Sequence, residues 1–174
     1  DLRILQPTNL KSKSFLEELA DLRGDLQMVV AFRMLPEAVW SMPSLGTINL
    51  HASLLPAFRG AAPINWAIIK GEKQTGLTTF FIEKQIDTGN ILQVRKVEIA
   101  ADDTAGSLHD RMMNIGAELV LDTVLAVSKG DVTPSTQDHS KATRAPKIFR
   151  EDCKIDWSAS AKTIHNHIRG LTPF

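Results

Sequence analysis

The sequence contains a single cysteine, no excess of either charge and no long apolar run, and each shortage excludes a class of protein. Cys153 alone cannot form an internal disulfide or a metal site built from several thiolates, which favours a reducing compartment. Lys plus Arg and Asp plus Glu each number 20, whereas a surface built mainly to bind phosphate backbones would be strongly basic. No apolar run approaches the roughly 20 residues of a membrane span, and no signal peptide opens the chain. We therefore expect a cytoplasmic protein that does not bind membranes. We also expect a monomer, although none of these features bears on the oligomeric state.

The composition is that of an ordinary globular protein. Of the 174 residues, 43% are hydrophobic and 23% are charged, so a disordered or fibrous chain is excluded. The length suits one domain or a large piece of a longer protein. Because the chain opens on Asp1 without a methionine and closes on Phe174 only a few residues after an expected helix, we expect a fragment.

Strand-like and helix-like segments alternate along the chain, which predicts an α/β domain with a largely parallel sheet flanked by helices. The expected strands cover residues 2–5, 26–32, 47–52, 77–82 and 90–99. The expected helices cover residues 13–23, 36–40 and 63–70, then a long helix that begins at the cap Asp103-Thr104 and stops at Gly130, and a last helix within 155–169.

The composition changes after Gly130. Residues 131–150 are polar, include Pro134 and Pro146, and show no periodicity, so we expect a linker there. The predicted organisation is a catalytic domain over 1–130, the linker over 131–150, and the start of a second domain over 151–174.

The end of the strand at 47–52 carries a pair of polar residues. Asn49 and His51 are two positions apart, so both side chains point to the same face, while Leu50 points to the other. Reactive groups gather where strands of an α/β sheet run into loops. Asp87, in a glycine-containing turn after another strand, is expected at the same edge of the sheet.

These three residue types suit acyl transfer to nitrogen. An imidazole can take the proton of an attacking amine, an amide can donate to the oxygen that becomes negative, and a carboxylate can orient the imidazole. Taken singly, each residue has a simpler interpretation: His51 as a hydrogen-bonded core residue, Asn49 as a turn cap, and Asp87 as a turn residue. No metal is implied by this chemistry.

Four strings together resemble the folate-dependent formyltransferase family: NLHASLLP at 49–56, FRGAAPI at 58–64, TGLT at 75–78 and IDTG at 86–89. The resemblance covers essentially the whole chain. It implies a Rossmann-like formyltransferase fold that lacks the first strand-helix-strand unit and most of the C-terminal domain. It also implies 10-formyltetrahydrofolate as the formyl donor, used as a co-substrate.

The same resemblance implies roles for individual residues. Asn49, His51 and Asp87 would be the catalytic trio. The residues implied to bind the folate are Arg33, Met34, Leu35, Ser53, Leu54, Leu55, Pro56 and Ile86.

The residues after Pro56 resemble the branches of the family that formylate initiator methionyl-tRNA or amino-sugar nucleotides. The first is the expected acceptor, and the second is the alternative. A folate-binding or tRNA-binding module without activity also remains open. Four basic residues of the linker, Lys141, Arg144, Lys147 and Arg150, are either a solvated surface or contacts for tRNA phosphates.

Overall fold

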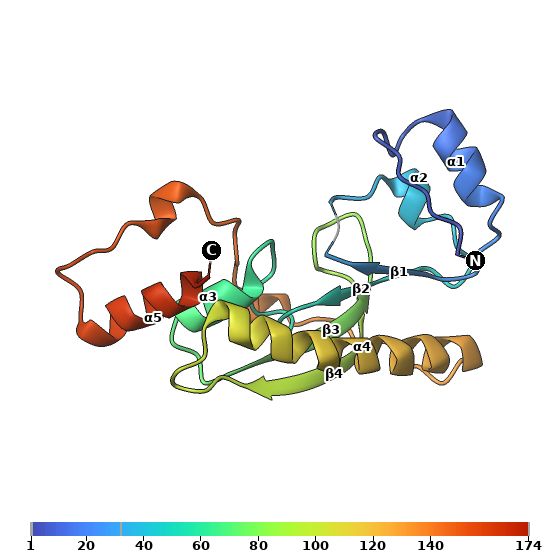
Figure 1. Ribbon diagram of the computed structural model, residues 1–174. Helices are drawn as coiled ribbons and strands as arrows, with labels where there is room; N and C mark the ends of the chain where they lie inside the picture. The colour runs from blue at the N-terminus through green and yellow to red at the C-terminus, as the bar shows by residue number, and fades with distance from the viewer. Residues whose placement is uncertain (1, 32, 174) are drawn as a thin grey trace.

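A four-stranded sheet lies at the centre of the computed structural model, which describes residues 2–31 and 33–173 (Figure 1). Its strands lie side by side in chain order: β1 (Gln27–Val30), β2 (Thr47–His51), β3 (Gln74–Phe81) and β4 (Ile91–Glu98). β1 pairs with β2 in parallel, whereas β3 is antiparallel to both β2 and β4. The α/β class is confirmed, but the prediction of a largely parallel sheet is wrong for the described strands.

The reason lies in the connections. A parallel pair needs a crossover of about a dozen residues or more, but residues 82–90 join β3 to β4 without a helix, so these strands form an antiparallel pair. Between β2 and β3 there is a helix, and the strands are nevertheless antiparallel. Alternation of element types therefore predicts the class of the fold and not the direction of each strand.

The described residues form five α-helices: α1 (Lys13–Ala20), α2 (Glu37–Trp40), α3 (Pro63–Ile69), α4 (Ala105–Lys129) and α5 (Ala161–Leu171). Figure 1 shows α1 and α2 near β1 on the right of the view, and α5 beside α3 on the left. Two short 3₁₀ turns, His139–Lys141 and Arg150–Cys153, interrupt the irregular chain between α4 and α5. Among the described residues, no helix combines the length and the apolar character needed to cross a membrane.

Helix α4 covers one face of the sheet. Its buried residues Leu108, Met112 and Leu119 belong to one apolar cluster with Leu77 of β3 and Val97 of β4. Burial of apolar side chains of this size stabilises a fold by roughly 2 kcal/mol each. This cluster fixes β3 and β4 against α4.

Local chemistry sets both ends of α4. The Thr104 side chain accepts a hydrogen bond from the Ser107 amide, and the Ser107 hydroxyl accepts one from the Thr104 amide. Gly130 ends the helix with a φ of 74°, a left-handed conformation that glycine adopts without a steric cost. The predicted helix from the Asp103-Thr104 cap to Gly130 is confirmed.

One predicted element is absent. Residues 2–5 form no strand, and Leu2 and Ile4 are 95% and 78% exposed. A strand needs a neighbour for its backbone hydrogen bonds, and in the described part of the chain this segment pairs with none. Asp1, Phe32 and Phe174, which belong to predicted segments, lie outside the described residues.

The segment 131–150 has little regular structure, as predicted, but it is packed against the rest of the chain. The Ala145 amide donates to the Arg59 carbonyl at 2.7 Å, and the Arg59 amide donates to the Thr143 carbonyl at 2.9 Å. Gly60 has a φ of 125°, and a Cβ atom there would lie 2.5 Å from the Ala145 carbonyl oxygen. This close approach holds the segment along residues 58–62.

Candidate active site

Asn49 and His51 project from β2 into one open cleft of about 1250 Å³. Opposite them in the sheet, Phe80 pairs with Asn49 and Thr78 with His51. His51 is the last residue of β2 and is only 6% exposed, whereas Asn49 is half-buried. The period of two along a strand puts both polar side chains on one face of the sheet, and both line the cleft, which Leu50 between them also lines.

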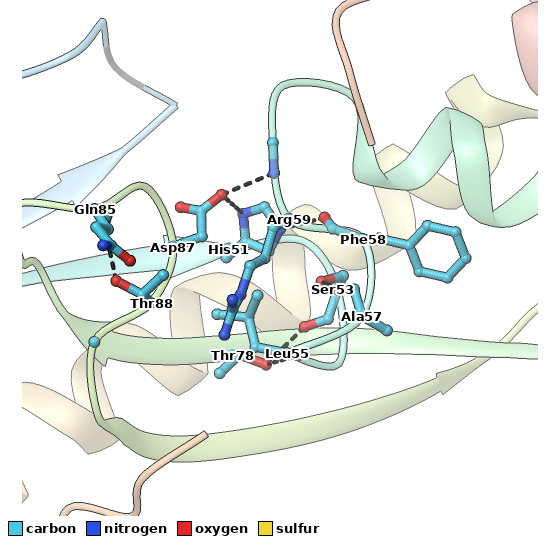
Figure 2. Close-up of polar contacts among 12 residues, drawn as sticks. His51, Ser53, Leu55, Ala57, Phe58, Arg59, Thr78, Gln85, Asp87 and Thr88 are labelled. Atoms are coloured by element: carbon cyan, nitrogen blue, oxygen red, sulfur yellow. Dashed lines mark hydrogen bonds and ion pairs between the residues drawn. The ribbon is translucent and has the colours of Figure 1, made fainter. Parts of the chain in front are cut away.

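The contacts of His51 define the roles of its two ring nitrogens (Figure 2). Nε2 lies 2.8 Å from the carbonyl oxygen of Phe58. Because a carbonyl can only accept, Nε2 carries a proton and donates it. In the neutral ring, Nδ1 is then the basic nitrogen, and it lies 3.7 Å from Oδ2 of Asp87.

Asp87 reaches this position from the loop between β3 and β4. Its backbone φ of 55° is left-handed, which Asp tolerates better than most residues. Oδ2 accepts a hydrogen bond from the Gly60 amide at 2.8 Å, and the side chain is 11% exposed. The distance to Nδ1 is longer than a hydrogen bond but short enough for an ion pair once the ring is protonated. The structure thus brings Asp87 and His51 together, as the sequence predicted.

Four other predicted residues line the same cleft: Arg33, Met34, Leu35 and Ile86. The Arg33 guanidinium donates to the Pro7 carbonyl at 2.8 Å. Met34 and Ile86 are 75% and 59% exposed, so the rim of the cleft offers apolar side chains to a ligand. Apolar walls with a few polar groups are typical of sites for flat organic ligands.

The structure does not bring Ser53, Leu54, Leu55 and Pro56 to the cleft. The fully buried Ser53 hydroxyl donates to the Ala57 carbonyl at 2.6 Å (Figure 2). The Leu55 amide donates to the Thr78 hydroxyl, which in turn donates to the Ser53 carbonyl. These contacts close a turn after β2, so in this structure the Ser53 side chain stabilises the turn and does not face the cleft.

Three polar groups at the site were not predicted from the sequence: the Phe58 carbonyl, the Gly60 amide and the Gln137 side chain. The first two are backbone groups, for which the residue type gives no signal. Gln137 belongs to a polar segment without periodicity, yet it is only 4% exposed and contacts both Asp87 and Arg59. Its burial depends on contacts with residues far away in the sequence.

Comparison with known proteins gives two family matches. The formyl transferase model matches residues 2–124, and the model for the C-terminal domain of formyl transferases matches residues 147–174. A methionyl-tRNA formyltransferase of Flavobacterium johnsoniae is 55% identical over 175 residues, which cover 100% of this chain and 56% of that protein. A methionyl-tRNA formyltransferase of Bacteroides thetaiotaomicron is 51% identical over 178 residues, 100% of this chain and 55% of that protein. The chain thus spans just over half the length of these relatives.

Solved structures show the same fold at lower identity. An N-formyltransferase from Helicobacter canadensis, in complex with folinic acid and dTDP-3-aminofucose, is 26% identical with a TM-score of 0.67, covering 71% of this chain and 46% of its own. A sugar N-formyltransferase from Shewanella is 22% identical with a TM-score of 0.80, covering 94% and 66%. HypX from Aquifex aeolicus, in complex with tetrahydrofolic acid, is 24% identical with a TM-score of 0.77, covering 92% and 28%.

Proposed function

Because this chain belongs to the formyl transferase family, we propose that the protein moves a formyl group from 10-formyltetrahydrofolate to the amino group of methionine on initiator methionyl-tRNA. Relatives that are 50–55% identical to the chain carry the name methionyl-tRNA formyltransferase. One observation carries the proposal: Nδ1 of His51 lies 3.7 Å from Oδ2 of Asp87, at the wall of a cleft that Asn49 also lines.

The cleft is the proposed folate site. 10-Formyltetrahydrofolate supplies the activated formyl group when it is bound. Met34, Leu35 and Ile86 would pack against the flat ring, and Arg33 would contribute to the same pocket. The N-formyltransferase from Helicobacter canadensis, which is 26% identical to this chain, was solved with folinic acid, and this supports a folate as the ligand of the cleft.

His51 is the proposed base. An amine attacks only when it has lost its proton, and an imidazole can accept that proton near neutral pH. Since Nε2 donates to the Phe58 carbonyl, the proton goes to Nδ1. The Asp87 carboxylate then faces the new N–H and stabilises the imidazolium, while the Gly60 amide fixes Oδ2. Catalytic hydrogen bonds of this kind commonly tighten in the complex with substrate.

Asn49 is the proposed donor to the formyl oxygen. As the amine attacks, this oxygen gains negative charge, and a side-chain amide fixed on a strand can donate to it without reorganising. Asn49 shares the cleft with His51 and lies two residues before it on β2. Amide and imidazole would therefore act on the same carbonyl group. The methionine nitrogen would bond to the formyl carbon, the bond from that carbon to N10 of the folate would break, and the proton taken up by His51 would go to N10.

We also propose the division of the chain into a catalytic domain at 1–130, a linker at 131–150 and the start of a second domain at 151–174. The two family matches, which leave 125–146 between them, support it. Initiator tRNA is used in the cytoplasm, where the reaction would take place. The monomeric state stays a prediction that sedimentation of the purified protein would test.

The test is a formyl-transfer assay of the full-length gene product with 10-formyltetrahydrofolate and two acceptors, methionyl-tRNA and an amino-sugar nucleotide. We expect formylation of methionyl-tRNA, with kcat/KM at least 100-fold higher than for the sugar (about 2.7 kcal/mol of discrimination). A higher kcat/KM for the sugar nucleotide would overturn methionyl-tRNA as the proposed acceptor. Binding of folinic acid without transfer to either acceptor would overturn the enzymatic role and support a folate-binding module.

A further inference from the structure

We propose that Gln137 is a positioning residue for the pair formed by Asp87 and His51, an inference that rests on the function proposed above. Gln137 lies outside the strands and loops that carry the pair, in the segment 131–150. It does not line the cleft, so it would act through the residues that it holds and not on the substrate.

Every hydrogen-bonding atom of the Gln137 carboxamide has a partner. Nε2 donates to the carbonyl oxygens of Asp87 at 3.0 Å and Gly89 at 2.8 Å. Oε1 accepts from Nε of Arg59 at 3.2 Å and from its Nη2 at 2.5 Å. Carbonyls can only accept and a guanidinium can only donate, so the amide fits in one orientation. With 4% of the residue exposed, water cannot replace these partners easily.

The two carbonyls that Gln137 binds flank Thr88 in the turn that presents Asp87. The left-handed backbone of Asp87 is uncommon even for Asp, which tolerates it better than most residues, and contacts around the turn stabilise it. Fixing the carbonyls on both sides of Thr88 fixes the peptide planes of the turn. The direction in which Asp87 projects its carboxylate toward Gly60 and His51 follows from those planes.

The carbonyl oxygen of the Gln137 amide, Oε1, binds Arg59. In the sequence, Arg59 lies between the two residues whose backbone groups contact His51 and Asp87. Phe58 accepts from His51, and Gly60 donates to Asp87. Arg59 also contacts Nδ1 of His139 at 3.1 Å, and its own amide binds the Thr143 carbonyl. Gln137 therefore joins the loop that fixes the imidazole to the turn that carries the carboxylate.

A purely structural role would also explain a buried, fully bonded glutamine, and the two roles predict different kinetics. A residue that only stabilises the fold lowers the amount of folded protein and leaves kcat per folded molecule unchanged. A positioning residue changes the geometry of the pair, and a misplacement of about 1 Å can cost roughly 100-fold in rate. Substrate binding, which depends on other groups of the cleft, would stay nearly constant.

The test compares the substitutions Gln137→Glu and Gln137→Asn in the full-length protein. Glu keeps the length and the acceptor for Arg59 but offers no N–H to the carbonyls of Asp87 and Gly89. Asn keeps the amide but is one methylene shorter, so it cannot reach both ends. If Gln137→Glu does not fold, the kcat of folded Gln137→Asn decides between the positioning role and a purely structural role. The matched control is Trp66→Phe, which removes a different hydrogen bond to the segment, from Nε1 to the Pro146 carbonyl at 2.8 Å.

We expect kcat for methionyl-tRNA to fall about 10- to 100-fold in the Gln137 variants, with both KM values within about twofold of the unsubstituted protein. Trp66→Phe should keep kcat per folded molecule. Unchanged kcat in the folded Gln137 variants, or an equal loss in the control, would overturn the positioning role. If the unsubstituted protein transfers no formyl group, the proposed function fails instead, so the two failures are distinguishable.

Discussion

The carboxylate of Asp103, next to the start of α4, should make the stability of the fold depend on pH. It accepts hydrogen bonds from both terminal nitrogens of Arg111, at 2.9 and 2.6 Å, from the Ala100 amide at 2.7 Å and from the Ser107 hydroxyl at 3.1 Å. Led by the Arg111 contact, these bonds lower the pKa of Asp103 from 3.8 to about 2, against the opposing effect of burial. The Asp103 side chain is only 6% exposed, but that of Arg111 is 42% exposed, so solvent screens part of the leading contact.

The size of the effect follows from this pKa difference. One pKa unit corresponds to about 1.4 kcal/mol, so the lowering from 3.8 to about 2 corresponds to about 2.5 kcal/mol. Screening at the exposed Arg111 reduces the contribution of ionised Asp103 to about 2 kcal/mol of the free energy of unfolding. Because the pKa is lower in the folded chain, the contribution is fully present above pH 4 or so. It declines as the pH falls toward the folded value, to about 1 kcal/mol at pH 3.

The assay is urea unfolding at 25 °C, followed by circular dichroism, of the unsubstituted protein and the Asp103→Asn variant at pH 7, 5, 4 and 3. The variant should be less stable by about 2 kcal/mol at pH 7, and the difference should shrink to about half at pH 3. Glu118→Gln, at an exposed position of the same helix, should show no such trend. A difference that is absent at pH 7, or equal at pH 7 and pH 3, would refute the reasoning.

Three further predictions concern the site and the segment 131–150. Asn49→Ala should lower kcat about 10²- to 10³-fold, the usual effect of removing one donor to a developing oxyanion, and a kcat near that of the unsubstituted protein would contradict the proposed role. In ¹⁵N spectra, the neutral form of the His51 ring should be protonated at Nε2, because that nitrogen donates to the Phe58 carbonyl, and protonation at Nδ1 would contradict this contact. Replacing Lys147 and Arg150 by alanine should reduce the slope of log affinity for tRNA against log salt by about one to two, and an unchanged slope would show that neither residue contacts phosphate.

What the sequence predicted well depends on contacts between near neighbours. The bounds of α4 follow from the Thr104 cap and from Gly130, both of which act within one turn of the helix. The shared face of Asn49 and His51 follows from the period of a strand. Such features need no knowledge of the rest of the fold.

What the sequence did not predict depends on contacts between distant segments. The antiparallel direction of β3 and the absence of a strand at 2–5 are decided by which neighbours are available. The Ser53 hydroxyl donates a hydrogen bond to the Ala57 carbonyl, and the sequence alone does not show this contact. Gln137 is 50 residues from Asp87 along the chain, and only the folded structure shows that they touch.

The most direct test of the proposed catalytic pair, His51 and Asp87, is the Asp87→Asn substitution in the full-length protein. Asparagine keeps the size of the side chain and can still accept from the Gly60 amide, but it carries no charge to stabilise a protonated His51. The matched control is Asp122→Asn, which removes an exposed carboxylate paired with Arg95. Formyl transfer to methionyl-tRNA, the affinity for folinic acid and unfolding by urea are measured on both variants.

We predict that Asp87→Asn binds folinic acid with unchanged affinity and unfolds at a similar urea concentration, while kcat falls by up to about 10⁴-fold, the loss seen for an orienting carboxylate in serine proteases. Asp122→Asn should match the unsubstituted protein in all three measurements. A folded Asp87→Asn variant that transfers formyl groups at the normal rate would contradict the central role of this carboxylate.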